Sequence, residues 1–524
     1  MRILLVPLDD RPVTYTYPQL IMKSARVEPV LPPRSLLGSL NRPAQIDELL
    51  SFCENIIQKN TPDAVILCLD SLLYGGLITS RRTDEDLKII NERLERIKKW
   101  RQLGQSAKPQ IKFYAQSSIM RISDNYDNTE EKDYWKTYGR ELFEWSGCLH
   151  RLAKREKLTP GLLESLERKI PEAIRKDYFD TRLRNFTINQ FVLRAMDRSK
   201  GTPFLDYLVF SQDDSGTWGL NVSEKERLEA ECAALKLDER VTAYAGADEV
   251  ACTLISRALI DYAVQTETAT RRPLLSVRFS PKETCSIASR YEGQEIGATV
   301  KAQVKACGVD FVIEDNDANG AESKNTGKQP SFTLIVHGPR ERQGDHITLP
   351  GLPDLSQLDT RAAVEATLKA IKETESDVIL ADVAYANGGD PLLVEELLKA
   401  PDMMTKIKSY AGWNTTGNTM GSALALAVAY WFYRENENQE HSPSAPNKLT
   451  EHQKQCLFTR FLDDWAYQAR VRRNLDGDPS TQRLAEQISP FIKSISQAVS
   501  IEPAVRLSFP WRRTFEIEIG FEGS

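Results

Sequence analysis

Short runs of apolar residues alternate along the chain with longer segments in which apolar residues are spaced three and four positions apart. The second pattern predicts amphipathic helices, as in DEDLKIINERLERIKKWRQL at residues 84–103. Apolar runs of strand length between such helices predict buried parallel strands joined by right-handed crossovers. The predicted strands lie at Ile3–Leu8, Val27–Leu31, Ala64–Leu69, Ile111–Ala115, Tyr207–Phe210, Val241–Ala245, Leu274–Phe279, Phe311–Glu314, Phe332–Val336, Val378–Val383 and Ile407–Ala411.

Two arrangements of these strands fit the pattern of an α/β protein. In the first, the six early strands and the last two close into a (β/α)8-like barrel, with residues 273–352 as an inserted small α/β subdomain. In the second, residues 1–265 and 270–435 form two doubly wound domains. The strand count slightly favours the barrel, and both arrangements place function at the carboxyl ends of the strands.

The chain beyond these strands predicts less regular organisation. The α/β domain is expected to span residues 1–435, and the polar segment 436–447 is typical of a linker. Residues 448–524 are predicted to be mostly helical, with one or two terminal strands. The charged, helical segment 129–200 is expected to be structural padding between two strands, and 315–329 is expected to be a loop.

Composition and charge exclude several classes of partner. A net charge of −6 over 524 residues argues against nucleic acid as the main partner, because phosphate binding needs a concentrated basic surface. We find neither a secretory signal nor an apolar stretch of membrane-spanning length, and the eight cysteines form no CxxC. Histidines at metal-ligand spacing and glycine-rich nucleotide motifs are also missing. We therefore expect a soluble, cytoplasmic protein that binds a small molecule or carbohydrate, without metal or cofactor; the sequence leaves its oligomeric state open.

Acidic and amide side chains follow almost every predicted strand. The adjacent Asp213 and Asp214 are the strongest catalytic candidates, because two close carboxylates cannot both ionise freely and one is then poised as an acid. Trp218 offers a flat apolar face on which a sugar ring can stack. An aspartate after a strand can equally cap the next helix, and this simpler interpretation applies to each site taken singly. The side chains predicted to bind substrate are Asp9, Asp10, Arg11, Asp70, Tyr74, Arg121, Trp218, Asp248, Glu249, Asp382, Asn387, Trp413 and Asn414.

Four motifs together resemble an uncharacterised bacterial protein family, a domain of unknown function. They are PLDDRPV, LDSLLYGGL, SQDDSGTWGLN and YAGWNTTGNT, and the resemblance covers most of residues 1–435. It implies no assigned activity.

The order SQDDSG, ADVAYANGGD, AGWNTTGN is also similar to that in barrel N-acetyl-β-hexosaminidases. That resemblance implies that one of Asp213 and Asp214 orients the substrate's acetamido group while the other protonates the leaving oxygen. It implies that Asp382, Asn387 and Asn414 hold sugar hydroxyls and the acetamido group. The sequence departs from the pattern where Gly-Gly follows Asn387, and PLDDRP has no clear counterpart.

The leading hypothesis is therefore a glycoside hydrolase acting on N-acetylhexosamine-type or related sugars. A conventional glycosidase could instead pair Asp213 or Asp214 with Glu249. A non-catalytic carbohydrate or metabolite binder is a further alternative. The remaining one is a Mg²⁺- or Mn²⁺-dependent phosphoester hydrolase with ligands among Asp9, Asp10, Asp70, Asp213, Asp214 and Asp248.

Overall fold

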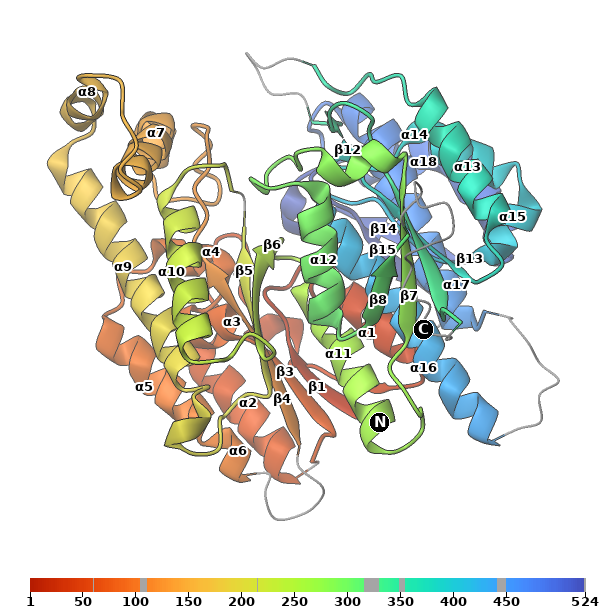
Figure 1. Cartoon of the computed structure of the whole chain (residues 1–524), viewed down its shortest axis with the longest axis horizontal. Helices are drawn as coiled ribbons and strands as arrows, with labels where there is room; N and C mark the ends of the chain where they lie inside the picture. The colour runs from red at the N-terminus through yellow and green to blue at the C-terminus, as the bar shows by residue number, and fades with distance from the viewer. Residues whose placement is uncertain are drawn as a thin grey trace. The chain divides into compact units, whose positions relative to one another are not determined.

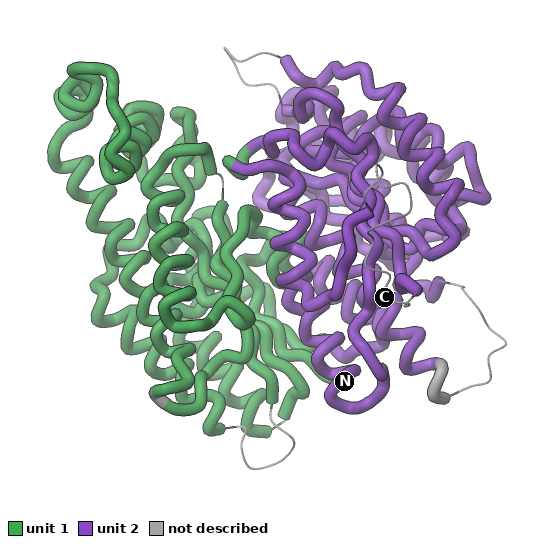
Figure 2. The backbone as a smooth tube through the Cα atoms, in the orientation of Figure 1, with its two compact units in different colours: residues 1–15, 29–251, 291–293 green, residues 16–28, 252–290, 294–524 purple. Residues whose placement is uncertain are grey.

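A computed structural model divides the chain into two compact units (Figure 2). Unit 1 comprises residues 1–15, 29–251 and 291–293, and unit 2 comprises residues 16–28, 252–290 and 294–524. The structure describes residues 1–59, 61–103, 111–213, 215–314, 329–347, 354–440 and 449–522.

Unit 1 is built on an open six-stranded sheet with strand order β2-β1-β3-β4-β5-β6 (Figure 1). Neighbouring strands from β1 to β6 pair in parallel, so their carboxyl ends meet at one edge. All five residues of β3 are buried, as expected for an apolar strand covered by helices on both faces. The strands are β1 (Arg2–Val6), β2 (Glu28–Val30), β3 (Ala64–Cys68), β4 (Lys112–Ile119), β5 (Tyr207–Gln212) and β6 (Val241–Ala245).

The helices of unit 1 include those of the long segment between β4 and β5, called the excursion below. There, α7 and α9 pack around an apolar core of their own that contains Trp135, Leu142 and Tyr178. Such a core makes the excursion a folded part of the unit. The helices are α2 (Ile46–Lys59), α3 (Leu69–Tyr74), α4 (Leu77–Arg82), α5 (Leu87–Lys98), α6 (Trp100–Leu103), α7 (Trp135–Ala153), α8 (Leu162–Lys169), α9 (Glu172–Arg194) and α10 (Leu220–Ala234).

Unit 2 contains an open five-stranded parallel sheet with order β13-β11-β9-β7-β8. Counted within the unit, this is the order 2-1-3-4-5, which is also the order of the first five strands of unit 1. Both sheets therefore follow one doubly wound plan. The strands are β7 (Leu274–Ser280), β8 (Asp310–Ile313), β9 (Phe332–His337), β11 (Val378–Asp382) and β13 (Ile407–Ala411); a separate two-stranded ladder joins β10 (Gly344–Asp345) to β12 (Tyr385–Ala386).

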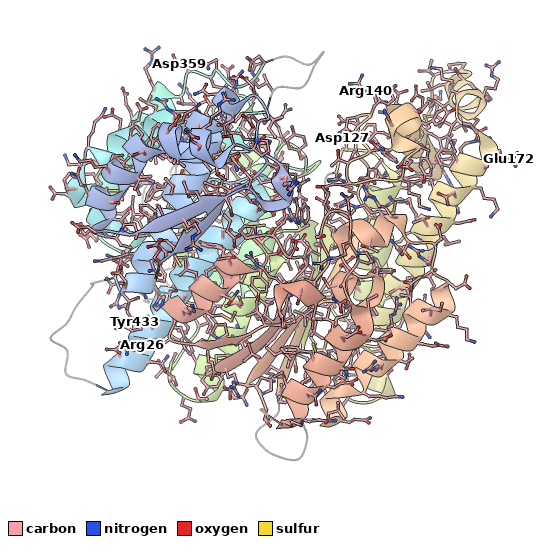
Figure 3. The ribbon with its side chains drawn as sticks, turned by 180° about the vertical axis from the view of Figure 1, so that it is seen from behind. Arg26, Asp127, Arg140, Glu172, Asp359 and Tyr433 are labelled. Carbon is pink, nitrogen blue, oxygen red and sulfur yellow. The ribbon has the colours of Figure 1, made fainter. Side chains whose placement is uncertain are left out.

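Helices from distant parts of the chain complete unit 2. Helix α1 (Thr16–Ser24) packs against α16 (Thr416–Glu440) and α17 (Glu451–Arg460). Just beyond α1, the Arg26 guanidinium lies 4.8 Å from the centre of the Tyr433 ring (Figure 3). The remaining elements are α11 (Val250–Gln265), most of which belongs to unit 2, α12 (Ile296–Cys307), α13 (Arg361–Glu373), α14 (Pro391–Leu398), α15 (Pro401–Lys406), a π-helix (Phe461–Val471), α18 (Thr481–Val499), β14 (Val505–Ser508) and β15 (Glu518–Phe521).

The α/β class and the parallel strands are confirmed, because each predicted apolar run overlaps a strand. The (β/α)8-like barrel is not what forms: in the described residues the strands belong to separate open sheets. The segment predicted as an inserted subdomain supplies β7, β8 and β9, and β9 pairs with β11. Since β7 and β9 lie inside the second sheet, the doubly wound alternative describes the topology.

The predicted C-terminal region does not stand apart, because its described residues belong to unit 2. Its terminal strands form the antiparallel hairpin β14–β15. Within the predicted linker, residues 436–440 continue α16, and the rest lies outside the described residues, as does nearly all of the loop predicted at 315–329. No helix among the described residues has both the length and the apolar character needed to cross a membrane.

Candidate functional site

Arg11 joins the carboxyl ends of β1 and β6 in unit 1. The Asp9 carboxylate accepts hydrogen bonds from Arg11 Nε at 2.9 Å and from Thr14 Oγ1 at 2.7 Å. The other side of the guanidinium donates from Nη2 to Asp248 Oδ1 at 2.5 Å. All three charged side chains are buried. The structure therefore brings Asp9 and Arg11 together with Asp248, which lies more than two hundred positions further along the sequence.

Asp213, at the end of β5, lies among arginines. Its Oδ2 accepts a hydrogen bond from Arg81 Nη2 at 2.6 Å and lies 3.8 Å from Arg121 Nη1. The Asp213 side chain is 21% exposed, whereas that of Arg81 is 1% exposed. Arg121 also donates from Nε to Glu131 Oε1 at 2.7 Å and pairs with Glu130 at 3.2 Å. These residues form one network of acids and arginines around Asp213.

The Asp248 carboxyl titrates differently from an ordinary aspartate. Burial raises its pKa, and the nearby charges of Asp213 and Asp9 raise it further, while Arg11 opposes them. Asp248 is thus a buried carboxyl that retains its proton more readily, electrostatically coupled to the more exposed Asp213. A buried carboxyl with a raised pKa and specific charged partners is typical of acid–base sites.

Asp70 lies in the first turn of α3, directly after β3, and its side chain binds the neighbouring strand β4. Its Oδ2 accepts hydrogen bonds from the Ser118 backbone N–H and from Ser118 Oγ, both at 3.0 Å. Burial raises the Asp70 pKa. The strand order of unit 1 reverses between β1 and β3, and ligands of doubly wound sheets bind outside the carboxyl ends at such a point. Asp9, which follows β1, and Asp70, which follows β3, lie on the two sides of this point.

The other predicted site residues of unit 1 are buried or contact neighbouring side chains. Tyr74 belongs to the hydrophobic core, and Trp218 packs edge-on against His150 with ring centres 5.0 Å apart. Glu249 is fully buried. Asp10 is half-buried, 4.0 Å from an Arg42 nitrogen. Asp214, the second predicted catalytic residue, lies outside the described residues, and its pairing with Asp213 stays a prediction.

The late-strand residues Asp382, Asn387, Trp413 and Asn414 form a second group, in unit 2, because their strands belong to the second sheet. The Asn387 backbone N–H donates to the Asn414 carbonyl oxygen at 2.8 Å. Both asparagines have positive φ, 59° and 61°, a conformation common at functional sites. Trp413 packs edge-on against Phe515. The two loops thus meet within unit 2, and the described strands do not close into the barrel whose rim was expected to hold all the predicted residues.

A buried charged network lies beneath these loops. Asp382 Oδ2 accepts hydrogen bonds from the Asp390 backbone N–H at 2.7 Å and from the Tyr410 hydroxyl at 3.3 Å. His337, at the end of β9, contacts Asp390 Oδ2 through Nε2 at 3.1 Å. Burial raises the pKa of Asp382 to about 6. From the π-helix, Asp464 Oδ2 accepts the Gly412 backbone N–H at 2.7 Å.

Gly389 has no room for a side chain beside this network. A Cβ there would lie 2.2 Å from the Tyr410 hydroxyl oxygen and 3.0 Å from an Asp382 oxygen. The Tyr410 ring cannot easily move, since it stacks on Phe461 with ring centres 4.3 Å apart. We expect Gly389→Ala to lower the free energy of unfolding by about 1–3 kcal/mol in urea titrations.

The control for this substitution is Gly520→Ala, whose Cβ would meet only ordinary contacts at 3.8 Å. Equal unfolding curves for the two variants would show that the Tyr410 ring can move aside.

The sequence interpretation missed several residues of both networks. Arg81 stands next to Arg82 in a basic pair of a kind that is commonly solvated, whereas its burial depends on Glu131 and Asp213, which are distant in sequence. Arg460, Asp463 and Asp464 lie in a region that was predicted only as helical. Their spacing of three and four positions was the available signal for a shared helix face. Among the described residues, no three His, Cys, Asp or Glu side chains are grouped in a way that could hold a metal ion.

The fold and these networks define a two-unit α/β protein with open parallel sheets and carboxylates gathered at the carboxyl ends of its strands. The chain belongs to the family described as Protein of unknown function (DUF4127), whose model matches residues 3–520. The predicted membership of an uncharacterised family is thereby confirmed. No curated protein and no solved structure matches the chain.

Proposed function

We propose that the protein is a hydrolase that cleaves a glycosidic bond at the carboxyl edge of the unit 1 sheet. The observation that supports this is the pair of coupled carboxyls at the ends of β5 and β6: Asp248, buried with a raised pKa, and Asp213, which is partly exposed and paired with arginines. Glycosidases use one protonated and one ionised carboxyl on either side of the scissile bond.

In this proposal Asp248 donates its proton to the leaving oxygen. Asp213 accepts a proton from the water that attacks the anomeric carbon as the bond to the leaving oxygen breaks, and Arg81 and Arg121 hold its carboxylate in place. Arg11 orients Asp248 through the hydrogen bond to its Oδ1. The proposal therefore rests on Asp213 and Asp248, and the Asp213–Asp214 pair expected from the sequence stays a prediction.

The similarity to N-acetyl-β-hexosaminidases supports an N-acetylhexosaminide only as the first substrate to test. In a barrel, the three similar motifs would follow one another around a single rim. In this chain SQDDSG belongs to unit 1, whereas ADVAYANGGD and AGWNTTGN belong to unit 2. The sugar-binding roles inferred for Asp382, Asn387 and Asn414 rest on that resemblance alone and stay predictions.

A panel of chromogenic glycosides and phosphate esters tests this function on the purified full chain, with and without chelator. We expect chelator-resistant release from at least one glycoside, lost in Asp213→Asn. The matched control is Asp86→Asn, which makes the same change at an exposed aspartate without a side-chain capping bond. Release from phosphate esters alone, abolished by chelator, would contradict the proposal and favour the metal-dependent phosphoester hydrolase.

A further inference from the structure

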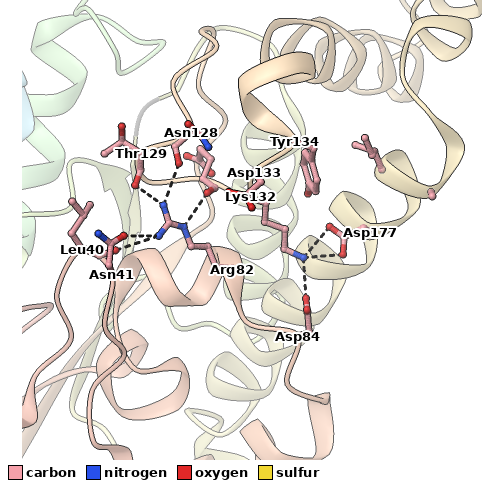
Figure 4. A pocket seen from close by; sticks show the side chains of 13 residues that line it. Leu40, Asn41, Arg82, Asp84, Asn128, Thr129, Lys132, Asp133, Tyr134 and Asp177 are labelled. Atoms are coloured by element: carbon pink, nitrogen blue, oxygen red, sulfur yellow. Dashed lines mark hydrogen bonds and ion pairs between the residues drawn. The ribbon is translucent and has the colours of Figure 1, made fainter.

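Unit 1 contains a pocket of about 760 Å³ that none of the predicted site residues lines (Figure 4). Its wall is formed by the end of α4, the segment leading into α7, and the first turns of α9. This volume lies within the range of pockets that hold small molecules. Figure 4 shows the Arg82 side chain pointing toward Asn41, Asn128 and Thr129, and that of Lys132 pointing toward Asp84 and Asp177.

The two cations of this pocket are already engaged. The Arg82 guanidinium donates from Nε to the Glu131 carbonyl oxygen at 2.9 Å and from Nη2 to that of Asn128 at 3.2 Å. The Lys132 ammonium lies between two carboxylates, 2.8 Å from Asp177 Oδ1 and 3.1 Å from Asp84 Oδ1. Neither cation is therefore well placed to bind an anionic ligand.

Carboxylates dominate the rest of the wall. Four acids and two cations line the pocket; since the buried Glu131 carboxylate pairs with Arg121 and Arg81, the acids available to a ligand are Asp84, Asp133 and Asp177. Asp84 and Asp177 are accessible, with 86% and 40% of their side chains exposed. Tyr134 adds an aromatic ring to the same wall, and aromatic faces attract ammonium groups.

We propose that this pocket binds a small polar molecule that carries an ammonium group. An amino sugar fits this chemistry, and naming a sugar rests on the proposed glycosidase function. Glu131 links the pocket to that site: it lines the pocket, and its Oε1 accepts a hydrogen bond from Arg121, which in turn faces Asp213. The pocket then holds the part of the substrate that is not cleaved.

Calorimetric titration of the full-length protein with three probes tests the charge preference. D-glucosamine, N-acetyl-D-glucosamine and glucose 6-phosphate share a sugar ring and differ in charge. At about pH 6, where the amine is protonated, we expect glucosamine to bind roughly fivefold more tightly than N-acetylglucosamine, and glucose 6-phosphate to bind most weakly. Preferred binding of the phosphate, or equal binding of all three, would overturn the proposal.

Two substitutions with opposite expected effects locate the binding. Asp177→Asn should weaken glucosamine binding severalfold, because it removes a carboxylate from the wall. Lys132→Met should strengthen it severalfold, because Asp177 and Asp84 become available to the ligand's ammonium group. The control is Asp180→Asn on the same helix, where the exposed carboxylate pairs with Lys176. Glucosamine binding that is unchanged in both pocket variants would contradict the site.

The proposed glycosidase function and the proposed pocket are tested by separate measurements. Binding is measured without turnover, so glucosamine affinity that depends on Asp177 supports the pocket even when every glycoside in the panel stays intact. Conversely, glycoside cleavage that requires Asp213, without any preference for glucosamine, supports the enzyme and overturns the pocket proposal.

Discussion

Asp248→Asn should lower kcat/KM for an alkyl glycoside by about 10²–10⁴-fold, the usual contribution of a general acid. A glycoside with a nitrophenolate leaving group should lose far less, because such a group departs without a proton. The substitution keeps the size of the side chain and an oxygen that can accept from Arg11 Nη2. A general structural defect would lower both rates equally, and that result would contradict the assignment.

The pH profile gives a second measure of the same residue. An acid must be protonated to act, so activity should fall as pH rises through the Asp248 pKa, which burial raises above that of an ordinary aspartate. Arg11 lowers this pKa, so Arg11→Met should move the fall in activity to higher pH. The profile of Asp86→Asn should match that of the wild type. A shift to lower pH in Arg11→Met would contradict the proposed coupling.

The sequence predicts the strands well because each strand depends on a local run of apolar residues. An uninterrupted apolar run such as AVILC at β3 needs burial on both faces wherever its partners lie. Sheet membership is not local: it depends on pairs such as Leu208 with Val241 and Val277 with Leu334, which no run of residues encodes by itself. Strand count alone therefore favoured a barrel where two open sheets form.

The difference between local and long-range information also explains which site residues were predicted and which were missed. Asn387 and Asn414 stand in short loops directly after strands, so their strand ends could be recognised. The role of Arg81 depends on partners distant in sequence, among them Asp213, 132 positions away. Trp218 was expected beside Asp213 because it is near in sequence, yet the turn directs its ring to His150. Proximity in sequence thus predicts the end of a strand more reliably than it predicts which side chains meet.

The second large effect, on stability, is expected at the buried ion cluster of unit 2, which consists of Arg460, Asp463 and Asp464. Arg460 pairs with Asp464 at 3.1 Å and with Asp463 at 3.4 Å, and its guanidinium lies 4.3 Å from the centre of the Tyr17 ring. Burial raises the pKa of Asp463 to about 6 and that of Asp464 to about 7, and Arg460 opposes both shifts. Two carboxyls therefore share one cation in surroundings that disfavour a second negative charge.

Arg460→Met should lower the free energy of unfolding of unit 2 by about 3–5 kcal/mol at about pH 8, because it leaves carboxylates buried without their cation. A raised pKa means that the folded state holds the proton more tightly than the unfolded chain. The stability that these groups contribute is then fully present below about pH 4 and is lost as pH rises through 6 to 7. At about pH 5 the two carboxyls are largely protonated and neutral, so removing their cation should cost less there.

Adding Asp464→Asn to Arg460→Met separates charge from packing. The asparagine retains an oxygen that can accept the Gly412 N–H and removes one negative charge. Urea unfolding of the double variant at about pH 8 should therefore recover part of the lost stability, whereas the two variants should differ little at about pH 5. An equal loss at both pH values, with no recovery in the double variant, would show that Arg460 acts through its packing on Tyr17 and not through its charge.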